Sequence, residues 1–226
     1  MNESTSGSAR VICISRALGA GGELVGRIVA EELGFGYVDE EIVQRAAEKV
    51  NVPADLVADT EQRTPLLRRL VGQVAVDLAG ASMYTGVVQP GGVMPTSDDY
   101  RDLIQQAIHE TARKGEVVIV AHAASIALAG QPEVLRVLIT ASPEVRAGRL
   151  AEELGLPVSE ASKLAREGDR ARADYLKRFY GLKRELPTHY DLVVNTDVLA
   201  PDSSAALVLV ACDRSNPQRR SGRGSG

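Results

Sequence analysis

The stretch "RVICISRALGAGGELVG", residues 10–26, decides the fold. The continuous apolar run at 11–15 predicts a short buried strand, and a glycine cluster follows it. Apolar residues over 22–33 then recur at helical spacing, with Gly34 as a C-cap. A strand that enters a helix through glycines is typical of a phosphate-binding turn, because backbone N–H groups and the positive helix end point at one spot.

Two ligand motifs fit this turn in part. "GAGGEL" begins like the dinucleotide fingerprint G-x-G-x-x-G, and Asp39 ends the next expected strand where a ribose-binding acid belongs. Leu24 occupies the third glycine position, however, which argues against the close helix–strand contact that glycine permits. A third interpretation needs no ligand, since a tight strand–helix turn can require glycine for steric reasons alone.

The mononucleotide motif G-x-x-x-x-G-K-[ST] is also incomplete. Its closing glycines survive as Gly19 and Gly21, whereas Arg16 replaces the opening glycine. Gly22 stands where the lysine belongs, and Glu23 follows it, so the loop offers no hydroxyl to Mg²⁺ there. On these residues alone, the dinucleotide, mononucleotide and purely structural interpretations all stay open.

The rest of the chain alternates strands with helices. Apolar runs predict further strands at 35–39, 116–122, 134–141 and 190–196. Helical spacing predicts helices at about 40–50, 60–80, 96–114, 143–154, 157–181 and 201–212. This alternation indicates βαβ units and a mostly parallel sheet covered on both faces. Residues 81–100 lack periodicity, which is typical of a functional or disordered loop.

Composition narrows the class of protein. The 226 residues are 44% hydrophobic and 25% charged, which suits one globular domain. A net charge of −4 argues against non-specific binding to nucleic acid or anionic membranes, and no apolar run is long enough to predict a membrane span. Cys13 and Cys212 lie in apolar runs and are expected to be buried thiols of a cytoplasmic protein, not metal ligands. The polar N-terminus lacks the apolar region of a signal peptide.

Several sequence blocks, taken in order over about residues 10–210, resemble the cytidylate kinase-like family, relatives of bacterial cytidylate kinase among the P-loop nucleoside monophosphate kinases. "ISRALGAGG" is similar to the family's ISR-x-x-G-x-G-G loop, which also lacks the lysine. "GFGYVDEEIV" and "YDLVVNTDVL" are similar to its second and last strands. "GEVVIVAHAASIAL" resembles a central strand that usually reads vIvGRgA. Its D-x-x-R-x-x-Y lid helix is matched by Asp169, Arg172 and Tyr175.

The resemblance implies a three-layer α/β P-loop kinase fold, with a parallel sheet of about five strands and a helical acceptor-binding and lid region. One domain at 10–212 would carry an acceptor-binding insertion at about 40–105 and a lid at about 157–186. Residues 1–9 and the basic tail 213–226 would be disordered. The implied activity moves a phosphoryl group from ATP, with Mg²⁺, to a nucleoside monophosphate or a similar small acceptor.

The same resemblance implies a set of site residues. The donor phosphates would meet Ser15, Arg16, Gly19, Ala20, Gly21, Gly22 and Glu23. Without a loop lysine, positive charge would come from Arg16 and from Arg166, Arg170 and Arg172 on the lid helix. The alternative for that helix is a solvated surface whose acidic residues, interleaved with the basic ones, form ion pairs.

The acceptor side is implied to contain Asp39, Arg45 and His122, with Asp39 also a candidate Mg²⁺ ligand. Asp39 could equally cap the following helix, and Arg45 could be a surface residue. His122 departs from the family, which usually has Gly-Arg at Ala121-His122. A histidine carries at most a partial charge near neutral pH. Two other functions therefore stay open: a catalytically inactive nucleotide-binding member that acts through partners, and, more remotely, an NAD(P)-dependent oxidoreductase.

Overall fold

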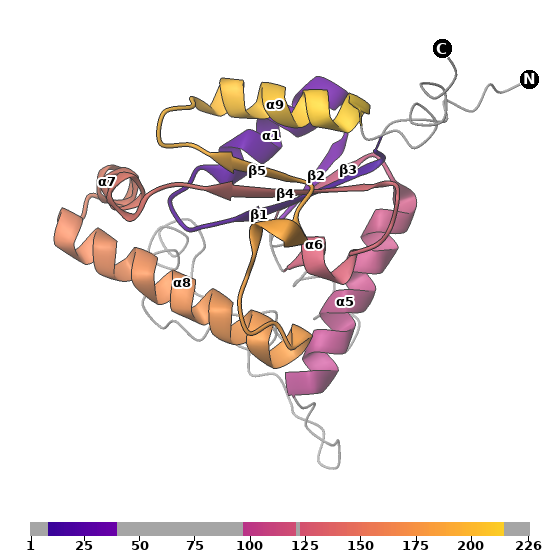
Figure 1. The fold of residues 1–226 in the computed structure, drawn as a ribbon, viewed down its shortest axis with the longest axis horizontal. Coiled ribbons are helices and arrows are strands. Elements are labelled where there is room, and N and C mark those ends of the chain that lie inside the picture. The colour runs from indigo at the N-terminus through magenta and orange to yellow at the C-terminus, as the bar shows by residue number, and fades with distance from the viewer. Residues whose placement is uncertain (1–8, 40–96, 121–122, 215–226) are drawn as a thin grey trace, which may run out of the picture.

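The computed structural model describes residues 9–39, 97–120 and 123–214, which form a sheet with helices on both faces (Figure 1). The strands are β1 (Val11–Arg16), β2 (Gly36–Val38), β3 (Val117–Val120), β4 (Val134–Thr140) and β5 (Leu192–Asn195). The helices are α1 (Gly22–Leu33), α5 (Ser97–Lys114), α6 (Ala124–Ala127), α7 (Pro143–Leu154), α8 (Val158–Tyr180) and α9 (Pro201–Arg214), with a 3₁₀ turn, η1, at Pro187–His189.

The five strands are all parallel and lie in the order β2-β3-β1-β4-β5. The central strand is β1, with Val11 opposite Val117 of β3 on one side and Val134 of β4 on the other. The chain first builds the β2–β3 side of β1 and then crosses to the β4–β5 side. The carboxyl end of β1 therefore lies where the strand order reverses, which is where open α/β sheets bind ligands.

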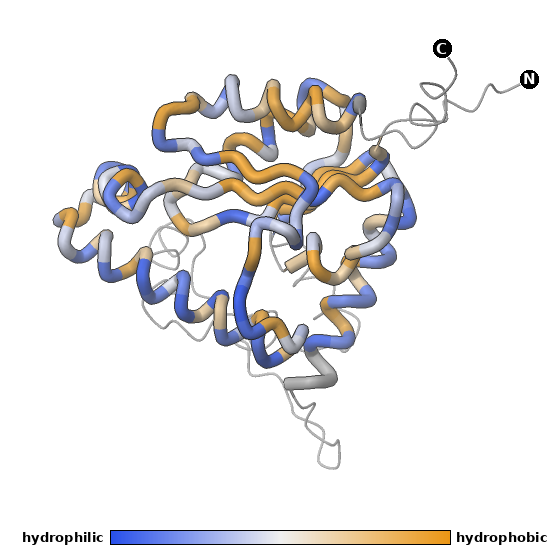
Figure 2. The backbone as a smooth tube through the Cα atoms, in the orientation of Figure 1, coloured by the Kyte–Doolittle hydropathy of each residue, from blue (hydrophilic) through white to orange (hydrophobic). Residues whose placement is uncertain are grey.

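Alternate residues of β1 supply two separate hydrophobic cores. Ile12 and Ile14 pack in the core that includes α1 and α9, whereas Val11 and Cys13 pack in the core that includes α5 and α6. Because β1 is covered on both faces, its sequence is continuously apolar, and Figure 2 shows the same hydrophobic colouring along the inner strands. The predicted three-layer α/β fold with a five-stranded parallel sheet is confirmed.

Helices α7 and α8 pack against each other at the carboxyl edge of the sheet, with their axes crossing at a large angle (Figure 1). Ser142 caps α7 by accepting a 3.4 Å hydrogen bond from the Val145 N–H, and Pro143 takes the first helical position. Leu18 packs against the small core between the two helices. The α7–α8 pair is thus fixed beside the β1–α1 loop.

Most element boundaries follow the sequence signals. Both α1 and α7 cover the predicted residues and end at glycines with positive φ, Gly34 and Gly155. The short elements α6 and η1 were not expected. The predicted helices at 40–50 and 60–80 and the loop at 81–100 lie almost wholly outside the described residues, and the division of the chain into insertion, lid and tails stays a prediction. Among the described helices, none is long and apolar enough to cross a membrane.

Candidate functional site

The β1–α1 loop turns sharply through two glycines in the left-handed region. Gly19 has a φ of 79° and Gly21 a φ of 78°, values that residues with a Cβ rarely adopt. A Cβ at Gly19 would lie 2.8 Å from the Arg146 carbonyl oxygen, so this position requires glycine for space as well. Ala20 is buried between them, and its N–H donates to the Ala17 carbonyl at 3.0 Å.

The start of α1 leaves donors available. Gly21 is its N-cap residue and provides no side-chain cap. Within the described ranges, no acceptor pairs with the N–H groups of Gly22, Glu23 and Leu24, and none pairs with that of Gly19. These groups lie at the positive end of a 12-residue helix, at the carboxyl end of the central strand. The loop has the backbone features of an anion site.

Arg16 lies directly over Gly22. A Cβ built on Gly22 would be 2.6 Å from the Arg16 Cβ, so the arginine stem fills the space that a side chain at position 22 would need. The Arg16 Nε lies 2.6 Å from Glu23 Oε1, and the two side chains are 23% and 39% exposed. This contact is an ion pair without good hydrogen-bond geometry. The loop therefore carries a solvent-accessible cation, paired with the first-turn carboxylate.

Two side chains fix the loop from behind. The Thr196 hydroxyl, which follows β5, donates to the Ala20 carbonyl at 2.9 Å. Arg149 of α7 donates to the Thr196 hydroxyl at 2.9 Å and to the Thr196 carbonyl at 2.6 Å. Ser15 points elsewhere: its buried hydroxyl donates to Ser125 of α6 at 3.1 Å. The Ser15 side chain is therefore engaged with α6, and its contact with the donor phosphates stays a prediction.

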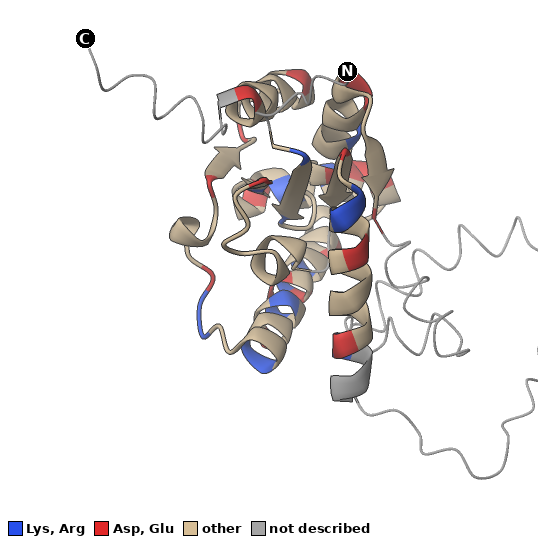
Figure 3. Cartoon of the chain, turned by 90° about the vertical axis from the view of Figure 1, so that its right-hand side faces the viewer, with Lys and Arg blue, Asp and Glu red and all other residues tan. Residues whose placement is uncertain are grey.

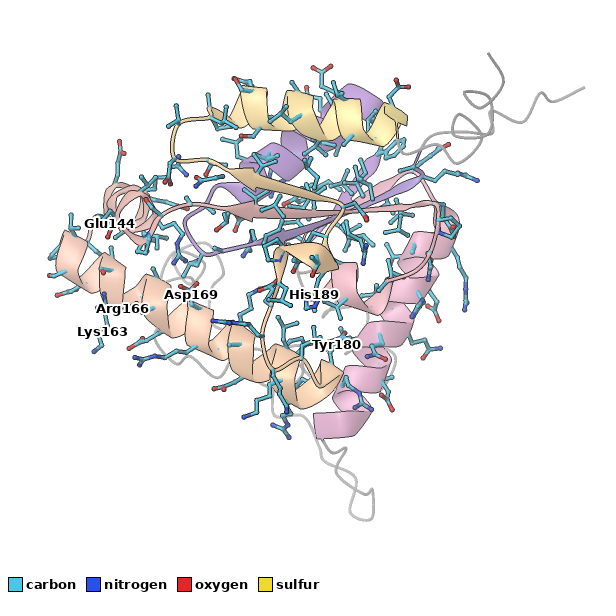
Figure 4. All side chains as sticks on the ribbon, viewed as in Figure 1. Glu144, Lys163, Arg166, Asp169, Tyr180 and His189 are labelled. Carbon is cyan, nitrogen blue, oxygen red and sulfur yellow. The ribbon has the colours of Figure 1, made fainter. Side chains whose placement is uncertain are left out.

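An ion pair between the buried Arg146 and the exposed Asp169 ties α7 and α8 to the loop. Arg146 is 6% exposed, and both of its terminal nitrogens donate to Asp169, at 2.8 and 2.7 Å. The same guanidinium donates to the Leu18 carbonyl at 3.4 Å. The hydrogen bonds from Asp169 raise the pKa of Arg146, and burial opposes them. Figure 4 shows Asp169 on the side of α8 that faces the sheet.

The three predicted lid arginines lie in different environments. Arg172 donates to both oxygens of Glu185, at 3.0 and 2.7 Å, and to the Tyr190 hydroxyl at 3.3 Å. Burial alone would lower the pKa of Arg172, but the hydrogen bond and charge of Glu185 raise it overall. The exposed Arg166 donates to Ser162 one turn earlier, at 2.6 Å, and lies on the outer side of α8 (Figure 4).

Arg170 is exposed and has no partner among the residues that the structure describes. Figure 3 shows basic residues along α8. Of the three predicted lid arginines, Arg172 is therefore held in a polar cluster, whereas Arg166 and Arg170 face solvent. A role in catalysis stays a prediction for all three arginines.

A cleft of about 190 Å³ opens between the loop and α8. Ala17 contributes the loop side, Thr140 the end of β4, and Asp169 and Arg172 the helix side. The segment 182–185 closes the bottom. The carboxyl edge of the sheet is therefore hollow next to the glycine turn, with charged side chains on the facing wall.

The end of β2 brings a second group of charges near the loop. The Tyr37 hydroxyl donates to Asp39 at 3.3 Å, and the Arg27 guanidinium lies 4.4 Å from the Tyr37 ring centre. Burial, followed by the negative charge of Asp39, raises the pKa of Tyr37 to about 12. The negative charge of Glu23 also raises the pKa of Tyr37, so both carboxylates lie close enough to affect this side chain. In the described part of the chain, no three metal-ligating residues gather into a metal-binding group.

Comparison with known proteins supports the mononucleotide interpretation of the loop. The model of the Cytidylate kinase-like family matches residues 11–198, most of the chain. The protein belongs to this family. A cytidylate kinase from Ignicoccus hospitalis is 27% identical over 194 residues, or 85% of this chain and 93% of that protein. One from Methanopyrus kandleri is 28% identical over 118 residues, 49% of this chain and 61% of the relative, so this match spans about three fifths of the relative's length.

Among solved structures, an uncharacterized protein from Eubacterium ventriosum aligns with a TM-score of 0.61 at 17% identity, covering 90% of this chain and 98% of that chain. This likeness concerns the fold alone. A shikimate kinase from Bacteroides thetaiotaomicron aligns with a TM-score of 0.47 at 16% identity.

The loop and lid residues are assigned by motif and stay predictions, and the acceptor side is only partly described. Arg45 and His122 lie outside the described residues. Ala123, directly after His122, is buried with a φ of 53°. The family pattern usually has glycine at that position, which suits a left-handed backbone. The assignments of Asp39, Arg45 and His122 to the acceptor stay predictions.

Sequence reasoning missed the residues that hold the loop in place, Arg146, Arg149 and Thr196, and it missed Glu185, which holds Arg172. One local signal was available for the first two. "PEVRAGRL" starts a helix straight after a strand and puts its two arginines three residues apart, on one helix face. Thr196 ends the strand predicted at 190–196, but no signal in the sequence indicates its contact with Ala20. Glu185 lies in an irregular segment with no periodicity.

Proposed function

We propose that this protein transfers a phosphoryl group from ATP to a nucleoside monophosphate. One observation carries the proposal: a left-handed glycine turn at the end of β1 leaves the first N–H groups of α1 without an acceptor among the described residues, in a member of the cytidylate kinase-like family. Phosphoryl transfer needs positioning and positive charge more than covalent catalysis, and this turn can supply both. The family match also favours the mononucleotide motif over the dinucleotide one.

The loop fits the phosphates of ATP. Gly19 leaves no room for a Cβ, and Gly21 and Gly22 bring the backbone close enough to donate to phosphate oxygens. Arg16 adds a guanidinium that can bind two oxygens at once. Thr196 and Arg149 keep the Ala20 carbonyl turned away from the phosphate side, because that oxygen accepts hydrogen bonds behind the loop.

The residues around the loop also fit Mg²⁺, although they offer no loop hydroxyl. The carboxylates of Glu23 and Asp39 are oxygen ligands of the kind that Mg²⁺ prefers. To bind the ion, the Glu23 carboxylate would leave its ion pair with Arg16. When bound, Mg²⁺ would neutralise charge on the phosphate oxygens during transfer.

On the facing wall, Arg166 and Arg170 are exposed and can turn toward a phosphate when α8 approaches the loop. Arg172 is held by Glu185 and acts as a support for that wall. The cleft between loop and α8 gives the reacting groups a partly enclosed space. Asp39, Arg45 and His122 are proposed to contact the acceptor, whose identity as a nucleoside monophosphate rests on the family.

A second candidate function is nucleotide binding without transfer. It is favoured by the pairing of two candidate cations, since Arg16 is bound to Glu23 and Arg172 to Glu185. A cation that keeps its carboxylate partner contributes little net positive charge to a transition state. In that case the protein would act through partners. Cytoplasmic localisation stays a prediction for either function.

The two functions separate in one assay. The purified full-length protein is incubated with Mg-ATP and each nucleoside monophosphate in turn, and ADP release is measured. Turnover with any acceptor supports the kinase and removes the binding-only candidate. If no acceptor gives turnover, calorimetry with ATP and with NAD follows. Binding of ATP alone supports the second candidate, and binding of NAD alone would overturn both.

A further inference from the structure

We propose that the phosphate loop of this protein has exchanged the positions of its glycine and its cation. In the usual motif, glycine opens the loop and lysine follows the closing glycine. Here Arg16 stands at the opening position and Gly22 at the lysine position. Arg16 would supply the charge that binds the donor phosphates, and Gly22 would be the positioning residue that makes room for it. The inference rests on the proposed function.

The backbone does not explain the glycine at position 22. Gly22 is the first residue of α1, and its φ is not in the left-handed region, unlike that of Gly21. An L-residue could adopt this backbone conformation, so the glycine needs another explanation. A Cβ at Gly21 would meet nothing within 4 Å. A Cβ at Gly22 would meet three carbons of one side chain.

Those three carbons are the stem of Arg16. The Cβ at position 22 would lie 2.6, 3.2 and 3.4 Å from the Arg16 Cβ, Cδ and Cγ. The closest contact is with Cβ, which cannot move by a change of rotamer because it is fixed to the backbone of the loop. A side chain at position 22 and a side chain at position 16 therefore exclude each other, already at the Cβ atom.

The Arg16 side chain places its guanidinium beside the first turn of α1, where a cation of the loop could contact a bound phosphate. Arg16 Nε contacts Glu23, whose own N–H is one of the unpaired donors of the first turn. The Glu23 carboxylate thus marks a point where an anion meets Arg16 beside the helix N-terminus. A phosphate that displaces this carboxylate would contact the guanidinium and the backbone donors together.

The test is a pair of single variants and their combination: Arg16→Gly, Gly22→Lys and Arg16→Gly/Gly22→Lys. Calorimetry measures the dissociation constant of Mg-ATP, and inorganic tripolyphosphate serves as a second ligand that reports the phosphate part alone. Each single variant is expected to weaken binding about 10- to 100-fold, since it removes or displaces a charged hydrogen-bonding group. The double variant restores the usual arrangement and is expected to bind within about 3-fold of wild type.

Gly22→Ala isolates the steric step, because it adds only the Cβ that collides with Arg16. Its matched control is Gly148→Ala, a glycine inside helix α7 whose added Cβ would meet nothing within 4 Å. Gly22→Ala is expected to weaken binding of both ligands at least about 5-fold, and Gly148→Ala to leave it unchanged. Circular dichroism confirms that each variant is folded. If Gly22→Lys does not fold, the double variant should, because removal of the stem restores the space.

Two results would overturn the exchange: wild-type affinity in Gly22→Ala, or a double variant whose loss equals the sum of the single losses or that does not fold. Failure of the proposed function looks different, since then the wild-type protein binds neither Mg-ATP nor tripolyphosphate. Wild-type binding without rescue in the double variant rejects only the exchange.

Discussion

The β1–α1 loop and helix α8 both carry arginines near the cleft, but they hold them differently. The side chains of Arg16 and Arg172 are equally exposed, at 23%. In the loop, one nitrogen of Arg16 contacts Glu23, beside backbone donors that have no acceptor among the described residues. On α8, two nitrogens of Arg172 donate to Glu185, and one of them also donates to Tyr190. A pair held by one contact exchanges its anion more readily than a bidentate pair with a third hydrogen bond. Proximity to the cleft therefore does not by itself make an arginine a phosphate ligand.

The largest effect is expected from Arg172→Ala, which leaves Glu185 without its partner. We expect a loss of about 2–3 kcal/mol in unfolding free energy, between the values for exposed and fully buried pairs, because Glu185 is 24% exposed. Urea unfolding measures it. Arg166→Ala, on the exposed side, serves as the control and should change stability by less than about 0.5 kcal/mol. Unchanged stability together with weaker ATP binding in Arg172→Ala would make Arg172 a phosphate ligand after all.

Arg170→Ala tests whether an exposed arginine of α8 contacts a bound phosphate. This exposed arginine belongs to the turn of α8 in which Gly168 packs against Leu18 of the loop, and the prediction is that its long side chain reaches a bound phosphate. We expect kcat/KM to fall about 10-fold, or about 1.4 kcal/mol, with stability unchanged. Lys177→Ala is the matched control, since Lys177 is exposed on the same face two turns further along α8. Equal losses in both variants would mean that α8 acts only through its overall charge.

Gly21→Ala tests whether the loop backbone itself binds the ligand. Gly21 is the N-cap of α1 and Gly34 is its C-cap. Both have positive φ, and a Cβ added at either would meet no described atom within 4 Å. Alanine should therefore cost about 1 kcal/mol of stability at both positions. Only Gly21→Ala should also weaken ATP binding, because its strain re-aims the first-turn N–H groups. If Gly34→Ala weakens ATP binding equally, the loss comes from α1 as a whole.

The smallest effect is expected in the acid stability of the protein. Arg172 holds the pKa of Glu185 below its usual value despite the burial that opposes it. A lowered pKa in the folded state stabilises the protein above the unfolded-state pKa of about 4.3, and this contribution is lost as the pH falls below it. Glu185→Gln should flatten the decline of melting temperature with acid. The exposed Glu152→Gln should keep the wild-type slope, and an unchanged slope in Glu185→Gln would contradict the account.

The elements of this fold could be predicted because their signals are local. Residues 22–33 carry helical spacing and end at Gly34, and α7 begins at a Ser-Pro pair and ends at Gly155. The loop residues were predictable for the same reason, since they are adjacent in the chain. The supports of the site were not, because each joins distant positions. Arg146 meets Asp169 only through the packing of α7 on α8, and the interleaved charges of α8 do not reveal which arginine turns inward.

The contact between Thr196 and Ala20 joins residues 176 positions apart. During synthesis, the loop leaves the ribosome well before the strand that fixes its far side. Contacts of such long sequence separation form late in folding. The candidate nucleotide site should therefore be finished only after β5 and Thr196 have been synthesised. A chain shortened before residue 196 would keep every loop residue and still lack a fixed loop, and bound nucleotide would favour the fully folded protein over its intermediates.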